Sequence, residues 1–189
     1  MTPKQLFSRV RMDTAVNDMA AVKFSDYQML SALNSVLSII YGTISTMSST
    51  ILDTEVKITL KNGKGELPDD FLQAVLVTSD GTVLQPATKT QDIGSDTYRI
   101  VGNTIRSDNA SITLEYKPFF EELEYTDTDE DLDLPSLFNE LLRSYMITVL
   151  LSGAPNGELV QKVTTDVCRL VANREFTALN ADVAPVWKV

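Results

Sequence analysis

Four aspartates at alternate positions are the residues of this chain whose type and spacing come nearest to a site of chemistry. The run D-x-D-x-D-x-D consists of Asp127, Asp129, Asp131 and Asp133. Carboxylate oxygens suit Ca²⁺, but an EF-hand loop also requires glycine at its sixth position and glutamate at its twelfth. Here those positions hold Leu132 and Phe138. The four aspartates are therefore weak candidates for a looser divalent-cation site. The interpretation that we favour is a solvated acidic loop whose last carboxylates stabilise the start of the following helix.

The other motifs that could carry chemistry are explained by turns and by the core. Gly63-Lys64-Gly65 lacks the spacing of a phosphate-binding loop, so we interpret it as a turn. The single cysteine, Cys168, falls on a helical stripe of valine and leucine and is expected to be a buried, unreactive thiol. The chain has no histidine, which removes the usual general base and the commonest metal ligand. A glycosidase-like carboxylate pair has no aromatic-lined cleft to accompany it, and we expect neither an enzyme nor a bound cofactor.

The composition is that of one globular domain, or of one domain with a smaller one inserted. The chain has 189 residues, and 43% of them are hydrophobic, so a sizeable core can form. No apolar run approaches the roughly 18 residues that span a bilayer, and the first eleven residues contain no apolar signal segment. We therefore predict a protein that is made and kept in a cytoplasm and has no membrane contact.

Most of the negative charge lies in one stretch of the chain. The net charge is −10, but residues 121–134 contain eight acids and no base, which leaves only −2 for the rest. No basic patch of the kind that grips a nucleic-acid backbone is visible. Sequence-specific DNA binding is not expected. An acidic surface can nevertheless face DNA without gripping it, because like charges repel.

Helical periodicity lies on both sides of the middle of the chain. Thr2-Pro3-Lys4-Gln5 and Ser25 with Gln28 form two capping boxes, which predict a short helix near the N-terminus and a long one from about residue 26. Residues 15–22 are ambiguous between a loop and one or two helical turns. Apolar residues recur at helical spacing in three longer segments, which are 27–47, 137–150 and 159–171.

The middle of the chain is rich in short strands. Alternating or apolar runs separated by turn residues predict strands at 56–60, 71–78, 83–84, 98–101, 104–106 and 111–116. The sequence therefore predicts an α+β fold, in which an antiparallel helical bundle built from the N- and C-terminal segments carries a small antiparallel β-sandwich or barrel inserted between them. The expected divisions are a bundle of 1–52 and 134–176, a β module of 53–120, an acidic linker of 121–133 and an extended C-terminal arm of 177–189.

The C-terminal arm contains the only tryptophan of the chain. Its apolar residues have no local core to join, and they are Val183, Pro185, Val186 and Trp187. Trp187 either folds back on its own domain or anchors in a partner protein, where tryptophan is favoured. We favour the partner.

Several short phrases follow one another in an order found in a known protein family. The phrases are Phe24-Ser25-Asp26 with Leu33-Asn34, Glu66-Leu67-Pro68-Asp69-Asp70-Phe71, Tyr98-Arg99-Ile100-Val101-Gly102-Asn103, Ile112-Thr113-Leu114-Glu115-Tyr116-Lys117-Pro118, and Leu134-Pro135 before Leu137-Phe138-Asn139-Glu140-Leu141-Leu142. In sequence and spacing they resemble the head-to-tail connector (adaptor, or head completion) proteins of tailed bacteriophages. The resemblance covers about residues 15–175.

The resemblance implies a virion structural protein without enzymatic activity. Such proteins form a ring, usually a dodecamer, beneath the portal protein, extend the DNA channel and offer a docking platform to tail proteins. The resemblance also implies location at the head–tail junction after assembly in the host cytoplasm, and a C-terminal segment that contacts the portal, here Val183, Pro185, Val186 and Trp187. The acidic stretch departs from the family's pattern. The alternative is a soluble binding module, with a ligand-recognising β insertion or a calcium-holding acidic loop.

Overall fold

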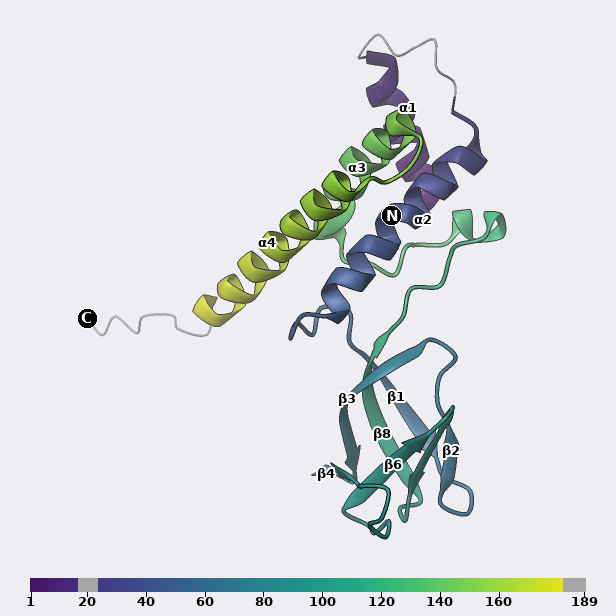
Figure 1. Ribbon diagram of the computed structural model, residues 1–189, viewed down its shortest axis with the longest axis vertical. Helices are drawn as coiled ribbons and strands as arrows, with labels where there is room; N and C mark the ends of the chain where they lie inside the picture. Colours follow the sequence, from purple (N-terminus) through teal and green to yellow (C-terminus); the bar gives the residue numbers. More distant parts are fainter. Residues whose placement is uncertain (17–23, 182–189) are drawn as a thin grey trace, which may run out of the picture. The chain divides into compact units, whose positions relative to one another are not determined.

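The chain folds into two compact units, and one is inserted into the other. The computed structural model describes residues 1–16 and 24–181. The first unit comprises Met1–Ile51 and Phe120–Val189, and the second comprises Leu52–Phe119. Within the described residues, the four α-helices belong to the first unit and two four-stranded sheets belong to the second (Figure 1). The fold is therefore α+β. We call the two parts the helical unit and the β unit.

The helical unit consists of helices that begin at clear sequence signals. Its elements are α1 (Pro3–Val16), α2 (Asp26–Ser45), the 3₁₀ turns η1 (Tyr125–Asp129) and η2 (Ser136–Phe138), α3 (Asn139–Ser152) and α4 (Gly157–Ala181). Both capping boxes are confirmed: the Gln28 backbone N–H donates to Ser25 Oγ at 3.3 Å, and the Gln5 N–H donates to Thr2 Oγ1 at 3.3 Å. Gly153, at φ 81°, ends α3 in the left-handed conformation that glycine adopts without strain.

The core of the helical unit joins all four helices. α2 packs against both α3 and α4, and α1 packs against α3. The largest fully buried side chains of this core are Leu6, Phe7, Met29, Leu33, Ile40, Ile44, Phe138, Leu142 and Met146. α4 contributes Val163, Val167 and Val171, each 0% exposed, so its buried stripe has the four-residue spacing of one helix face.

Three helical segments differ from the sequence predictions. α1 is 14 residues long rather than short, and it includes Ala15 and Val16 of the ambiguous segment, whose residues 17–22 lie outside the described part of the chain. α4 continues to Ala181, so residues 177–181 are helical where an extended arm was predicted. The physical reason is that no glycine or proline occurs between Gly157 and Pro185 to end the helix. The acidic stretch, predicted as a linker, contains the 3₁₀ turn η1 and belongs to the helical unit.

The β unit contains two sheets on one core. Its strands are β1 (Thr54–Thr59), β2 (Lys64–Glu66), β3 (Phe71–Ser79), β4 (Thr82–Val83), β5 (Gln85–Pro86), β6 (Thr97–Val101), β7 (Thr104–Ser107) and β8 (Ser111–Pro118). The strand orders are β1-β8-β3-β4 and β2-β7-β6-β5, with all pairs antiparallel except β5 with β6. Within this fully described unit the sheets do not close into a barrel, because β1 and β2 are both edge strands. Side chains from both sheets form the core, including Ile58, Val77, Ile105, Ile112 and Leu114.

A tight turn and a close approach position β1 and β2. Asn62 at φ 53° and Gly63 at φ 70° form the predicted Asn-Gly turn after β1. In β2, a Cβ on Gly65 would lie 2.4 Å from Ile58 Cγ2 and 2.7 Å from Leu60 Cδ2. Only glycine therefore allows the backbone of β2 to lie against the inward-facing side chains at the end of β1.

Candidate interaction surfaces

The acidic stretch is fastened to α2 by three separate contacts. Asn34 makes two hydrogen bonds with the backbone of Leu123: its Nδ2 donates to the carbonyl at 3.0 Å, and its Oδ1 accepts from the N–H at 3.2 Å. The rings of Tyr27 and Tyr125 stack with their centroids 5.3 Å apart. The hydroxyl of Tyr41 donates to the carbonyl oxygen of Asp133 at 2.5 Å. The acidic side chains are therefore displayed from a backbone that is held at several points.

The four aspartates of the candidate metal site have different partners. Asp127 Oδ2 accepts from the backbone N–H of Glu124 at 2.7 Å and so caps η1. Asp129 pairs with Lys4 at 2.5 Å, and the carboxylate of Asp131 lies 2.7 Å from the amino group of Met1. Among the described residues, no group of three or more acids or thiols could hold a metal ion. The structure thus does not bring these aspartates together as a cation site.

A polar cluster joins α1, the start of α2 and η1. Arg11 forms an ion pair with Oδ1 of Asp26, and the hydroxyl of Tyr125 donates to Oδ2 of Asp26 at 3.3 Å. The hydrogen bond from Arg11 is the main cause that lowers the pKa of Asp26 below its ordinary value. Asp26 also lies in the first turn of α2, where its negative charge interacts favourably with the helix dipole. This cluster explains the position of η1 and has no feature of a catalytic site.

A partly buried hydrogen bond links α3 and α4. The hydroxyl of Tyr145 donates to Oδ2 of Asp166 at 2.6 Å, and Arg169 lies 2.9 Å from Oδ1 of the same carboxylate. Burial, and then the hydrogen bond to Asp166, raise the pKa of Tyr145 to about 12. A tyrosine held neutral in this way is a poor proton donor at neutral pH. We therefore assign the pair to structure. Nearby in α4, Cys168 is only partly buried, which corrects the prediction of a buried thiol.

The helical unit carries a shallow pocket beside the acidic stretch. It has a volume of about 490 Å³ and is lined by residues of α2, Glu122 of the acidic stretch, and Pro155 and Val160 near the start of α4. Tyr27 on its margin is 71% exposed. Its lining mixes serine and asparagine with leucine and isoleucine, and no pair of titratable side chains faces across it in a catalytic arrangement.

Strand β3 presents apolar side chains to solvent. Leu72, Val75 and Leu76 are 49%, 43% and 38% exposed. The register against β8 shifts between Phe71 and Gln73 and again between Ala74 and Leu76, so Leu72 and Val75 are bulge residues. β4 pairs with β3 only at Thr78 and Ser79, so the bulged part of β3 has β8 as its one neighbour, and the bulges bend it while these side chains stay exposed.

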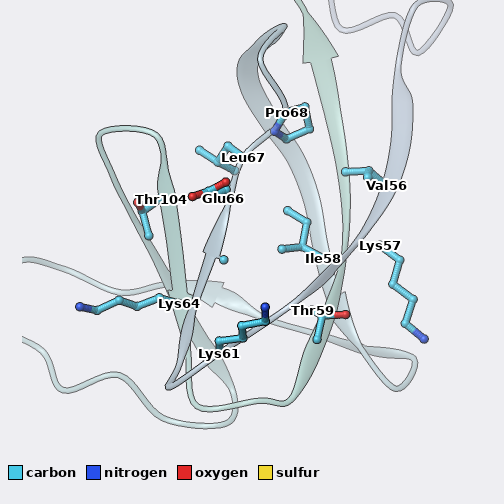
Figure 2. Close-up of a pocket in the computed structure, with 11 residues that line it drawn as sticks. Val56, Lys57, Ile58, Thr59, Lys61, Lys64, Glu66, Leu67, Pro68 and Thr104 are labelled. Atoms are coloured by element: carbon cyan, nitrogen blue, oxygen red, sulfur yellow. The ribbon is translucent and has the colours of Figure 1, made fainter.

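The larger pocket lies in the β unit, between β1 and β2. It has a volume of about 750 Å³, and its lining includes Val56, Ile58, Leu67 and Pro68 together with three lysines. Figure 2 shows Lys57 and Lys64 directed outward on opposite sides of the pocket and the ammonium group of Lys61 between them. Sequence reasoning missed this site because Gly63-Lys64-Gly65 was interpreted as a turn alone. The available signal was the run of three lysines without an acid between Glu55 and Glu66.

The residues predicted to contact a portal protein all come near the C-terminal end of the sequence. Val183, Pro185, Val186 and Trp187 lie outside the described residues.

Within the described part of the chain, no helix is both long enough and apolar enough to cross a membrane.

No protein-family model matches the chain, and no curated protein shows significant similarity to it.

Proposed function

We propose that this chain is a virion structural protein of a tailed bacteriophage: a head-to-tail adaptor that forms a ring, of about twelve copies by the resemblance, beneath the portal protein. In this proposal the helices form an antiparallel bundle and the β unit is a small sandwich. The ring extends the DNA channel and carries tail proteins, and the protein is not an enzyme.

The observation that carries the proposal is the order of the two units along the chain. The chain leaves the helical unit after Ile51 and returns to it at Phe120, and the β unit between these residues has its own core. The phrases that resemble the adaptor family bracket these crossings, with Phe24-Ser25-Asp26 before them and Leu134-Pro135 after them. An inserted unit with its own core can contact one partner while the helices contact their neighbours in a ring. Such a ring requires head-to-tail contacts between two different faces of each copy.

The charge distribution is compatible with a DNA channel. The acidic stretch has eight acids and no base, and Asn34 and Tyr41 hold its backbone on α2. A fixed negative surface repels the phosphate backbone, so DNA can pass without being gripped. This supports passage of DNA without sequence-specific binding.

The mass of the purified protein tests the proposal. Native mass spectrometry of the chain alone, and mixed with the portal protein of the same phage, should show a ring or a portal-bound ring. A variant that lacks residues 182–189 keeps the whole of α4 and should fold normally but lose portal binding. A protein that is monomeric alone and does not bind the portal protein would refute the proposal.

A soluble binding module remains the second candidate, because the pocket between β1 and β2 could receive a ligand. Its calcium form predicts a rise in melting temperature in millimolar calcium that Asp129→Ala and Asp131→Ala abolish. An unchanged melting temperature in calcium would refute the hypothesis of a calcium-binding acidic loop.

A further inference from the structure

We propose that the pocket between β1 and β2 binds an extended, acidic peptide segment of a partner protein, which joins the β unit as an added strand. We call it the β1–β2 groove, and its walls are the facing edges of these two strands. The inference goes beyond the adaptor function, because it holds for the β unit alone and names the chemistry of one partner.

The two strands that form the groove leave their facing edges without a partner strand. Beyond the turn, Lys61 and Lys64 exchange backbone hydrogen bonds of 2.8 Å and 3.1 Å, and the strands then separate. β1 pairs only with β8, and β2 pairs only with β7. An edge of this kind is a template for a further strand.

Hydrogen-bond alternation identifies the backbone groups that face the groove. Leu60 donates its N–H to the carbonyl of Ala110, on the β8 side, whereas Lys61 bonds to Lys64. Successive residues of a strand direct their backbone groups to opposite sides. The backbone N–H and C=O groups of Lys57 and Thr59 therefore point to the same side as those of Lys61, which is the side of the groove.

The same alternation applies to the other wall of the groove. Gly63 accepts from Ser107, and Leu67 donates to Asn103, so both are directed toward β7. Glu66 lies one residue before Leu67 and three after Gly63, so its backbone N–H and C=O point to the opposite side, into the groove. Each wall therefore offers backbone groups with which an incoming extended segment can pair.

The floor of the groove is apolar and can take side chains of such a segment. Ile58 and Leu67 are 8% and 4% exposed, and Val56 and Pro68 extend the same lining. The volume of about 750 Å³ is within the range of roughly 300–1,000 Å³ of pockets that bury a ligand. Alternate side chains of an added strand point to this floor, and the intervening ones point away from it.

The charge of the groove selects acidic residues at those intervening positions. Lys57, Lys61 and Lys64 are exposed, and none forms an ion pair with a described residue. Glu66 is the only acid in the lining. In a chain with a net charge of −10, this is a local positive region, and it attracts carboxylates by charge complementarity.

A peptide fits these features better than a nucleic acid does. Single-stranded nucleic acids are bound by long basic grooves with aromatic side chains on which bases stack. No aromatic residue lines this pocket. The unpaired backbone groups of Lys57, Thr59 and Glu66 instead match the N–H and C=O groups of another polypeptide.

A displayed library of random eight-residue peptides, selected on the immobilised full-length protein, tests the inference. Enriched peptides should carry Asp or Glu at alternate positions with apolar residues between them. The best synthetic peptide should bind at least tenfold more weakly to the variant with Lys57→Gln, Lys61→Gln and Lys64→Gln, and more weakly as salt rises. Amide NMR shifts on binding should concentrate in β1 and β2.

A matched control and two further peptides separate the possible causes. Lys89→Gln removes an exposed lysine of the same unit that does not line the groove, and it should leave affinity unchanged. The same peptide with Asn in place of each acid should bind at least tenfold more weakly, because it has lost its negative charge. A version with a central proline should also bind at least tenfold more weakly, because proline has no N–H to donate to a neighbouring strand. Neutral or basic enriched peptides, equal binding by the triple variant, or tighter binding of an oligonucleotide would overturn the inference. None of these measurements uses the portal protein or the ring, so the adaptor proposal fails or survives separately.

Discussion

Removal of one hydroxyl, in Tyr145→Phe, tests how the third and fourth helices are held together. The hydroxyl of Tyr145 in α3 donates to Asp166 in α4 at 2.6 Å, and Tyr145 is only 5% exposed. A hydrogen bond to a charged group contributes about 1.5–3 kcal/mol. Asp166 keeps Arg169 and has a side chain that is 26% exposed, so water can replace the hydroxyl. We therefore expect a loss near the lower end, about 1–2 kcal/mol.

The pH dependence of this loss has a definite sign. The pKa of Tyr145 rises from 10.0 in the unfolded chain to about 12 in the folded protein. The contribution of the tyrosine to stability is therefore complete below pH 10 and is lost as pH rises from 10 to 12, where the unfolded state releases its proton first. Each unit of difference between the two pKa values corresponds to about 1.36 kcal/mol. Above pH 10 the free energy of unfolding of the wild type therefore falls by up to roughly 2–3 kcal/mol relative to that of the Phe variant.

Urea unfolding followed by far-ultraviolet circular dichroism measures this difference, because the described helices all belong to one unit. The matched control is Tyr27→Phe, since Tyr27 is 71% exposed, and it should change stability by less than about 0.5 kcal/mol. The reasoning is refuted if Tyr145→Phe is as stable as the wild type at neutral pH. It is equally refuted if the gap between the two stays constant from pH 10 to 12.

Three further substitutions probe local contacts. Asn34→Ala removes both hydrogen bonds to Leu123, so a glutamate-specific protease should cleave the acidic stretch faster than in the wild type. The control is Ser35→Ala, because the Ser35 hydroxyl bonds within α2. Equal rates of cleavage in the two variants would contradict the prediction. Gly65→Val places atoms against Ile58, where a Cβ alone would lie 2.4 Å from Cγ2, and should destabilise the β unit by about 1–3 kcal/mol in hydrogen exchange of its strands. Gly42→Ala, with nothing within 4 Å, should instead stabilise α2 by up to about 1 kcal/mol, and a loss there would show that the space is not open.

Elements with a local signal could be predicted from the sequence. The capping box at Ser25 fixes the start of α2, because the same side chains that identify it also bond to the backbone. The alternation of Val56 and Ile58 with Lys57 identifies β1, and Asn62-Gly63 identifies the turn that follows. In each case the physical cause lies within a few residues.

Elements that depend on distant partners could not be predicted. Strand β2 reads Lys-Gly-Glu and has no apolar residue, and it is a strand only because its backbone pairs with β7. Residues 121–133 lack periodicity and were predicted as a linker, yet Asn34, far away in the sequence, holds Leu123 with two hydrogen bonds. The groove follows from the same cause, since it exists only where β1 and β2 separate and neither strand gains a second neighbour.

The opposite charges of the two candidate surfaces suggest a division of labour between the units. The helical unit carries an acidic stretch whose carboxylates are spread over separate partners, which suits repulsion of a polyanion rather than capture of an ion. The β unit carries three lysines around an open pair of strand edges, which suits capture of an acidic segment. Because the groove attracts carboxylates through its own lysines, binding to the β1–β2 groove should persist when the acids of residues 121–134 are neutralised.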